Sequence, residues 1–188
     1  DTLWRKSLRR HLKEDKPLLD TCCGTGDLTH VLSKKVSNIV SLDFSLEMLL
    51  KGRKQGWLKK NIVAGDASIL PCKDNSFMYI TIAFGIRNIP DVDNFINECA
   101  RVLMPGGKLI VLELTRPKNR VVRFFYNFYL QKVIPFIGGK ISGKREAYQY
   151  LSKTIATFID PVELQAKLEG NNFKDAIIKR KTFGIASV

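Results

Sequence analysis

The feature that most constrains this chain is the segment at positions 18–27, Leu-Leu-Asp-Thr-Cys-Cys-Gly-Thr-Gly-Asp. A short apolar run ends in the acid Asp20, and a tight turn of small residues around Gly24 and Gly26 leads into a helix-like stretch. A strand, a glycine turn and a helix start together favour a parallel sheet that holds a nucleoside-type cofactor at the carboxyl ends of its strands. Glycine suits this turn because the backbone must approach the ligand closely, often with a positive φ.

The turn differs from the dinucleotide-binding pattern G-x-G-x-x-G, since Thr29 stands where the third glycine would be. The chain also lacks the G-x-x-x-x-G-K-[ST] loop that binds triphosphates. An acid at the junction of strand and turn favours a cationic or amine-bearing ligand over a pyrophosphate. The segment therefore argues against a dehydrogenase. The alternative to cofactor binding is an ordinary connection between a strand and a helix that binds no ligand.

A second apolar run, at 38–43, also ends in an acid. Asp43 follows Gly26 by 17 residues, which is the spacing expected of a carboxylate that accepts both hydroxyls of an adenosine ribose. The alternative is that Asp43 caps the helix that begins near Leu46, a role that Ser45 would serve equally well.

A third run, at 61–67, ends in Asp66 and Ala67. Such a pair could accept a hydrogen bond from an adenine amino group and offer a backbone N–H to the ring. A turn-forming aspartate is the alternative interpretation of the same residues.

The next segments continue the alternation of strands and helices. A strand is predicted at 77–84, an amphipathic helix at 91–103 that ends at the Pro-Gly-Gly of 105–107, and a fifth strand at 108–114 that ends near Glu113. This order predicts an α/β fold, a doubly wound and mainly parallel sheet. The marked residues all fall at carboxyl ends of strands, where such sheets bind ligands.

These motifs resemble those of known enzymes. The superfamily of class I S-adenosylmethionine-dependent methyltransferases is matched by the segments at 20–27, 43–49, 65–71 and 101–107. The narrower ubiquinone/menaquinone biosynthesis C-methyltransferase family is matched by Asp74-Asn-Ser-Phe77, Phe84-Gly-Ile-Arg-Asn88, Phe128-Tyr129, Pro135-Phe-Ile-Gly138, Ala147-Tyr-Gln-Tyr-Leu151 and Thr182-Phe-Gly-Ile185. The resemblance implies one Rossmann-like domain over 1–188, with a seven-stranded sheet and a helical lid or insertion at 116–157 after the fifth strand. Compared with that family, an N-terminal segment that covers the cofactor and the C-terminal end are missing.

The resemblance also implies S-adenosylmethionine as the cofactor and no metal. The turn would hold its methionine end, Asp43 its ribose, and Asp66 with Ala67 its adenine. Ala83 occupies a contact position that often carries serine in the family. The implied cofactor-binding residues are Asp20, Gly24, Thr25, Gly26, Asp43, Phe44, Asp66, Ala67 and Ala83.

The implied reaction moves a methyl group to a ring carbon of a demethylated prenyl quinol, giving menaquinol or the equivalent ubiquinone precursor. A nearby cation would stabilise the phenolate that such a carbon needs as its neighbour, and Arg87 is the candidate. The alternative role of Arg87 is a salt bridge that pins the loop before Pro90. Asn88, Tyr148 and Tyr150 are weaker candidates for contacts to the quinol oxygens, and the sequence identifies no general base.

The chain carries a net charge of +13, and the stretch at 116–145 holds eight basic residues, no acid and many aromatic residues. Such a mixture can bind RNA, rest on an anionic bilayer, or simply form a helix that buries its apolar face. We expect a lid that admits a lipophilic substrate, with peripheral contact at the inner face of a membrane. The Phe-Gly-Ile-Arg-Asn at 84–88 replaces the Asn/Asp-Pro-Pro-Tyr of amino-methylating nucleic-acid enzymes, which disfavours an RNA methyltransferase. A non-catalytic cofactor-binding protein is the other alternative.

The cysteines suggest a reduced, cytoplasmic protein rather than a zinc or disulfide framework. Cys22 and Cys23 are adjacent, Cys72 and Cys99 are isolated, and the chain has no C-x-x-C. Pro-Cys at 71–72 resembles the nucleophile of cytosine-5 methyltransferases, but it precedes the fourth strand, so that Cys72 is interpreted as a packing residue. No run approaches 18 uncharged apolar residues. The sequence leaves open whether the enzyme is a homodimer.

Overall fold

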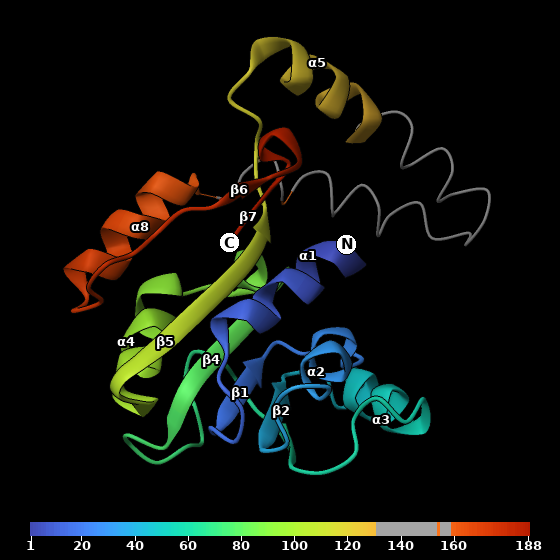
Figure 1. Ribbon diagram of the computed structural model, residues 1–188, viewed down its shortest axis with the longest axis vertical. Helices are drawn as coiled ribbons and strands as arrows, with labels where there is room; N and C mark the ends of the chain where they lie inside the picture. Colours follow the sequence, from blue (N-terminus) through green and yellow to red (C-terminus); the bar gives the residue numbers. More distant parts are fainter. Residues whose placement is uncertain (131–153, 155–158) are drawn as a thin grey trace.

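The computed structural model describes residues 1–130, 154 and 159–188. At its centre lies a seven-stranded sheet with the order β3-β2-β1-β4-β5-β7-β6 (Figure 1). The first five strands are parallel, and β7 runs antiparallel to both β5 and β6. This confirms the predicted α/β fold class. The strands are β1 (Leu18–Thr21), β2 (Ile39–Asp43), β3 (Ile62–Ala64), β4 (Phe77–Ala83), β5 (Leu103–Leu114), β6 (Arg180–Lys181) and β7 (Ala186–Ser187).

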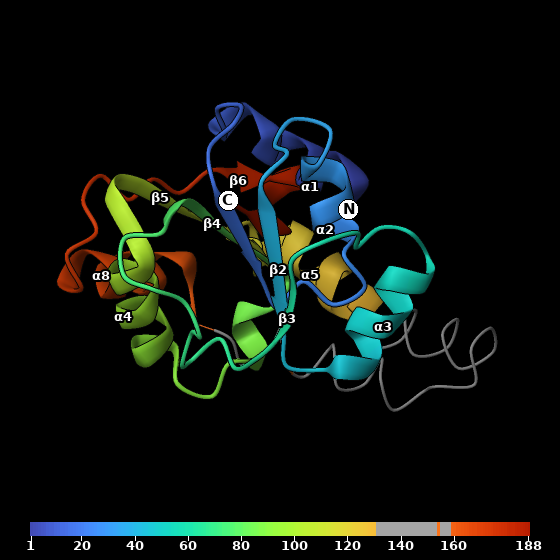
Figure 2. The same cartoon turned by 90° about the horizontal axis from the view of Figure 1, so that it is seen from below.

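Helices cover both faces of the sheet, as a doubly wound fold requires (Figures 1 and 2). One buried cluster joins the sheet to α4 and α8, and the other joins it to α1 and α2. The described helices are α1 (Thr2–Leu8), α2 (Asp27–Leu32), α3 (Leu46–Lys54), α4 (Val92–Val102), α5 (Arg120–Phe128) and α8 (Pro161–Gly170), with short 3-10 turns η1 (Arg9–His11), η2 (Ile86–Asn88) and η4 (Thr182–Gly184).

Strand β1 shows why the apolar runs are continuous rather than alternating. Successive side chains point to opposite faces of a strand, and Leu18 belongs to the cluster with α1 and α2 whereas Leu19 belongs to the cluster with α4 and α8. Both side chains are fully buried. A leucine buried in this way contributes roughly 1.5–3 kcal/mol to folding, so each face of the sheet stabilises its own layer of helices.

Side-chain caps determine where several helices begin. The Ser45 Oγ atom accepts a hydrogen bond from the Met48 N–H at 3.3 Å, and Asp91 Oδ1 accepts one from the Asn94 N–H at 2.9 Å. The cap of α3 is therefore Ser45, one of the two candidates that the sequence offered. This leaves the Asp43 side chain available for other contacts.

The fifth strand begins earlier than the sequence predicted. Helix α4 ends at Val102 and β5 starts at Leu103, which pairs with Phe77, whereas Tyr79 pairs with Lys108. The residues between are a local excursion in which Gly106 has a φ of +76°. The prediction of a strand from 108 was wrong at this boundary because Pro-Gly-Gly normally ends an element, whereas here β5 resumes its pairing beyond it.

Of the predicted insertion at 116–157, α5 is the main described element, and it lies beyond the carboxyl end of β5 (Figure 1). Its Tyr126 and the following Leu130 pack against Leu114 and Ile185. Tyr148 and Tyr150 lie outside the described residues. No helix in the described part of the chain is long and apolar enough to cross a membrane.

Candidate functional site

The glycine turn after β1 is held tightly by the rest of the fold. Gly26 has a φ of +85°, and a Cβ atom there would lie 2.4 Å from a methyl group of Leu58. On the other side, a Cβ atom on Gly52 would lie 2.4 Å from the Thr25 carbonyl oxygen. Helix α3 thus packs directly on the turn through Gly52. Sequence analysis missed this residue, although a glycine inside a helical pattern often marks such a close approach.

Asp43, at the end of β2, connects that strand to the turn. Its Oδ2 atom accepts the Gly24 N–H at 2.7 Å, and its Oδ1 atom accepts the Ser45 N–H at 2.8 Å. An ionised carboxylate has about four lone-pair positions, so each oxygen can accept a further hydroxyl. The geometry therefore permits the predicted ribose contact while Asp43 also positions the glycine turn.

The residues predicted around the adenine lie on the same edge of the sheet. The Phe44 ring is 81% exposed beside Asp43 and offers a free stacking surface. Asp66 is exposed and its Oδ1 atom accepts the Ser68 N–H at 2.7 Å, which is the turn that the sequence offered as the alternative. Ala67 is buried in the core and Ala83 is half-buried at the end of β4.

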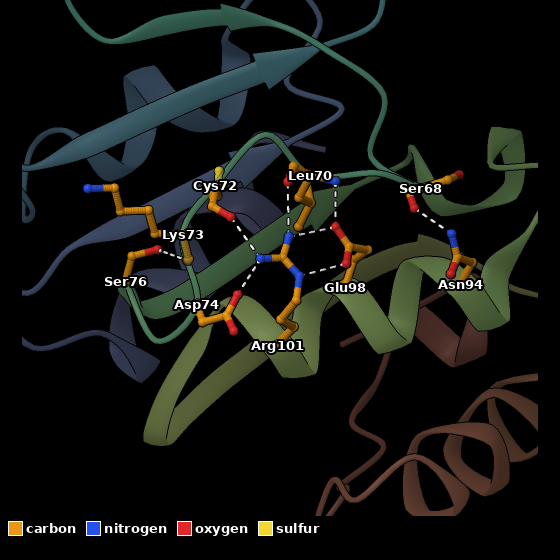
Figure 3. Close-up of polar contacts among 9 residues, drawn as sticks. All are labelled: Ser68, Leu70, Cys72, Lys73, Asp74, Ser76, Asn94, Glu98 and Arg101. Carbon is orange, nitrogen blue, oxygen red and sulfur yellow. Dashed lines mark hydrogen bonds and ion pairs between the residues drawn. The ribbon is translucent and has the colours of Figure 1, made fainter.

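The loop that carries Asp66 continues to β4 and is fixed by Arg101 of α4 (Figure 3). The guanidinium donates to the carbonyl oxygens of Leu70 and Cys72 at 3.0 and 2.8 Å. It also binds the carboxylates of Glu98 and Asp74, with N–O distances of 2.7 and 2.6 Å. The Cys72 side chain packs against the core, in agreement with its interpretation as a packing residue.

Asp20, which was predicted to bind the cofactor, is held by two hydroxyl groups of the protein, and its contact with the cofactor stays a prediction. Its carboxylate is fully buried and accepts hydrogen bonds from the hydroxyls of Thr29 and Thr81, at 2.6 and 2.8 Å. Burial raises its pKa to about 6, although both hydrogen bonds favour the charged form. Because it faces the interior beneath the turn, Asp20 acts here as a positioning residue that joins β1, α2 and β4.

Helix α1 brings a cation, Arg5, close to the same turn. The sequence alone did not assign Arg5 to the site. The Arg5 guanidinium lies 5.0 Å from the centre of the Phe84 ring. Burial lowers the Arg5 pKa, and the charges of Asp27 and Asp20 raise it. Phe84 itself has a φ of +59°, a costly conformation for a bulky residue that is often found at functional sites.

Arg87, the predicted acceptor-side residue, makes a buried ion pair with Glu113 at the end of β5. The bonded oxygen, Oε1, also accepts the Leu114 N–H at 2.7 Å. Burial raises the pKa of Glu113, and the Arg87 charge opposes that shift. This salt bridge ties η2, the turn that precedes Pro90, to β5, as the alternative interpretation of Arg87 predicted, and the acceptor-side role of Arg87 stays a prediction. Asn88 is exposed on the same turn.

The loops after β1 and β4 meet at Gly85. A Cβ atom on this glycine would lie 2.5 Å from the Cys22 Cβ atom, so no larger residue fits without movement. The glycine turn and the Arg87 turn are therefore adjacent. Burial raises the pKa of the Cys22 thiol to about 12, which keeps it protonated and unreactive at neutral pH.

Comparisons with known proteins match the whole chain to one family. The model of the ubiE/COQ5 methyltransferase family matches residues 1–188. This chain belongs to the ubiE/COQ5 methyltransferase family. The demethylmenaquinone methyltransferases of Lactobacillus johnsonii and Staphylococcus carnosus are each 38% identical, covering 98% and 99% of this chain and 80% of either relative. The enzyme of the same name from Shouchella clausii is 35% identical over 98% of this chain and 83% of the relative.

Solved structures support the fold of this ubiE/COQ5 member. A methyltransferase structure from Bacillus halodurans has a TM-score of 0.70 at 21% identity and covers 95% of this chain and 71% of that one. An S-adenosylmethionine-dependent methyltransferase from Thermotoga maritima has a TM-score of 0.67 at 21% identity, and the match covers 97% of this chain and 77% of that one. The predicted family and fold are confirmed, and the protein is an S-adenosylmethionine-dependent methyltransferase.

The residues of the site suit this cofactor. Asp43 retains lone pairs for a ribose, the Phe44 ring is free to stack, and Gly26 and Gly52 let Leu58 and α3 pack closely on the turn at 22–26. Such a site needs backbone and carboxylate acceptors rather than a metal-binding cluster, because the bound sulfonium supplies an already electrophilic methyl group.

Proposed function

We propose that this protein transfers a methyl group from S-adenosylmethionine to a ring carbon of a demethylated prenyl quinol, either demethylmenaquinol or the equivalent ubiquinone precursor. The observation that carries the proposal is the 35–38% identity to demethylmenaquinone methyltransferases over nearly the whole chain. These names favour a quinol over RNA as the acceptor, despite the basic composition.

The arrangement of charges supports this division of the site. Asp43 and Asp66, at the ends of β2 and β3, belong to the proposed cofactor side, and Arg87, after β4, belongs to the proposed acceptor side. A phenol titrates near pH 10, and a cation beside it lowers that pKa. Arg87 stays charged at neutral pH, so that it acts by stabilising the phenolate. Holding both partners in line supplies roughly 7–11 kcal/mol of the rate enhancement.

The cofactor assignments are Gly24, Thr25 and Gly26 for the methionine end, Asp43 and Phe44 for the ribose and adenine edge, and Asp66, Ala67 and Ala83 for the adenine pocket.

We expect Asp43→Ala to weaken binding of S-adenosylhomocysteine by about tenfold or more in calorimetry, because the cofactor loses two charge-assisted hydrogen bonds. Unchanged affinity would remove Asp43 from the ribose site.

The direct test of the function is methyl transfer by the purified protein to demethylmenaquinol with a short prenyl tail, followed by mass spectrometry. We expect a product heavier by one methylene unit that depends on S-adenosylmethionine. Activity on RNA but not on the quinol would reverse the choice of acceptor.

The proposal includes a membrane contact through 116–145, since a prenyl quinol resides in lipid. In the described part of this stretch, α5 exposes Phe124, Phe125 and Phe128, between 56% and 69% of each side chain. Basic residues at 116, 118, 120 and 123 accompany them. This combination suits an anionic lipid surface at the cytoplasmic face.

A further inference from the structure

Two buried polar atoms beside Arg87 lack a hydrogen-bond partner among the described residues. They are Glu113 Oε2 and the hydroxyl oxygen of Tyr126. Glu113 is 2% exposed and Tyr126 is 7% exposed. Tyr126 packs against Leu114, the residue that follows Glu113, and the charges of Arg87 and Glu113 both act on its phenol. Unpaired buried polar atoms reduce stability, so their presence at a strand end calls for a ligand that pairs with them.

The chemistry of these atoms specifies what that ligand is. Glu113 Oε2 can accept a hydrogen bond, the Tyr126 hydroxyl can donate one, and Arg87 contributes a positive charge. A group that matches them must donate and accept at one oxygen and must tolerate a neighbouring cation. A phenolic hydroxyl meets all three requirements, and its anion is stabilised by the cation.

The other carboxylates at this edge already have a protein partner on both oxygens or lie on the adenine side. Both oxygens of Asp20 and both oxygens of Asp43 accept hydrogen bonds from protein groups. Asp66 lies on the adenine side and bonds the Ser68 N–H. Among the described strand-end acids, Glu113 therefore combines a free buried oxygen with a place beside Arg87.

We propose that Glu113 and Tyr126, together with Arg87, form a subsite for one ring hydroxyl of the acceptor, in which Glu113 Oε2 takes the hydroxyl proton. This inference rests on the proposed function, and it supplies the general base that the sequence did not reveal. Tyr126 donates to the ring oxygen and Arg87 stabilises its negative charge.

The proton balance is complete without another reactant. The O–H bond breaks, the proton moves to Glu113 Oε2, and the electron pair stays on the ring oxygen. The ring carbon ortho to that oxygen takes the methyl group as the donor's carbon–sulfur bond breaks, with the bonding pair left on sulfur. The hydrogen of that carbon then leaves to water as a proton, and Glu113 returns its proton to the ring oxygen. One proton is released per turnover.

The first test is the pH profile of kcat at saturating donor. Glu113 must be ionised to accept a proton, so wild-type kcat should fall as the pH drops through the pKa of this residue. Glu113→Gln should lower kcat about 100-fold and abolish this acid limb, while Glu113→Asp should retain it. Binding of S-adenosylhomocysteine should stay unchanged. A Glu113→Gln enzyme that keeps the acid limb, or loses less than about tenfold in kcat, would overturn the proposal.

The acid limb of the kcat profile can be assigned to Glu113 by considering the groups that face it. They are Arg87, Tyr126 and Cys22. Burial raises the pKa of both the Tyr126 phenol and the Cys22 thiol to about 12, so neither titrates on the acid side, and Arg87 stays cationic. Asp20, with a pKa of about 6, is the rival group, and Asp20→Asn should retain the limb.

A matched pair of variants tests Tyr126 without relying on a large structural change. Tyr126→Phe removes an unpartnered hydroxyl, so its melting temperature should be unchanged or higher while kcat/KM falls about tenfold. Tyr79→Phe removes a buried hydroxyl that accepts the Lys13 N–H at 3.1 Å. It should lower the melting temperature and leave kcat/KM unchanged. Full activity of Tyr126→Phe would exclude Tyr126 from the subsite.

Binding separates this inference from the proposed function. We expect the protein with S-adenosylhomocysteine to bind 1-naphthol at least about tenfold more tightly than its methyl ether, which cannot donate to Glu113 Oε2. Equal affinities would show that a water molecule alone bridges the two atoms, and would overturn the subsite. If the protein discriminates between them but does not methylate the demethylated quinol, the subsite stands and the proposed function fails.

Discussion

Asp20 illustrates how one buried residue can hold together the elements around a site. Its carboxylate takes hydrogen bonds from Thr29 on α2 and Thr81 on β4, and Thr29 Oγ1 also lies 3.0 Å from Ser41 Oγ on β2. Four elements therefore meet at one buried acid. Such networks are favourable when each member is paired, but the charge itself is costly to bury. The raised pKa of Asp20 is a consequence of that cost.

This cost gives a prediction for Asp20→Asn. The folded pKa of about 6 exceeds the unfolded value of 3.8, so the contribution of Asp20 to stability is fully present below pH 3.8 and is lost as the pH rises through about 6. Each pKa unit corresponds to about 1.4 kcal/mol, which makes the total about 3 kcal/mol. Relative to wild type, the variant should gain about that amount in free energy of unfolding between about pH 4 and pH 7.

Urea denaturation at a series of pH values measures this difference. Thr81→Val, which removes one hydroxyl that donates to the carboxylate, should raise the Asp20 pKa further and move the window to higher pH. A difference between Asp20→Asn and wild type that stays constant across this range would show that Asp20 ionises in the folded protein without a penalty.

At the scale of elements, the connection from β3 to β4 contains no helix in the described chain, and Arg101 holds it instead (Figure 3). Besides the bonds of Arg101, the Leu70 N–H donates to Glu98 Oε2 at 2.7 Å and the Asn94 Nδ2 donates to the Ser68 carbonyl oxygen at 2.6 Å. The loop that begins at Asp66 is thus tied along its length to α4.

We expect Arg101→Lys to loosen this loop while keeping the charge. Lysine cannot reproduce the planar set of donors that bridges two carbonyls and two carboxylates. Losing several of these bonds should cost about 2 kcal/mol, which corresponds to a fall of roughly 4–8 °C in melting temperature for a chain of this size. Affinity for S-adenosylhomocysteine should fall with it, because the adenine side loses its support.

Lys167→Ala provides the control on the same helix layer. Lys167 pairs with Asp93 of α4 at 2.7 Å on the surface, and such exposed pairs contribute little. Its removal should leave both the melting temperature and the affinity unchanged. If Arg101→Lys behaves like Lys167→Ala in calorimetry and thermal melts, the Arg101 network does not organise the loop.

The elements were predictable where local pattern and tertiary structure agree. The runs ending at Asp43 and the helix starting after Asp91 follow apolar periodicity and capping, which are local signals. The start of β5 at Leu103 could not be predicted, because cross-strand pairing with Phe77 outweighed the Pro-Gly-Gly signal. The pairing is a long-range contact that the local sequence does not encode.

The site residues also divide into those that local sequence indicates and those that depend on long-range contacts. The glycine turn, Asp43 and Arg87 could be selected as candidates because their position after a strand marks them. Glu113 was noted at a strand end, but its free oxygen depends on Tyr126 arriving from α5. The close packing of Gly52 against the turn likewise joins segments distant in the sequence. Juxtapositions of this kind require the fold.

At the scale of the whole molecule, one peripheral helix, α5, carries both basic residues and exposed apolar side chains. The net charge is +13, and α5 lies beyond the carboxyl end of β5 (Figure 1). The phenylalanines of α5 are exposed, whereas its Tyr126 is buried against Leu114 and Ile185. A helix with one buried tyrosine and several exposed aromatic residues is stabilised from within and still offers an apolar face outward. Helix α5 therefore contributes Tyr126 to the proposed acceptor subsite and also carries the proposed lipid surface.

This placement predicts how the protein partitions onto vesicles. Sedimentation with vesicles containing anionic lipid should recover the protein at low salt and lose it as salt rises, because each basic residue near the surface contributes about 1 kcal/mol. Replacing Arg120 and Arg123 by glutamine should weaken partitioning roughly 30-fold. Phe124→Ser with Phe128→Ser should weaken it at every salt concentration, since the apolar term is not screened. Equal binding to neutral and anionic vesicles, or binding to RNA in place of both, would contradict a lipid role for α5.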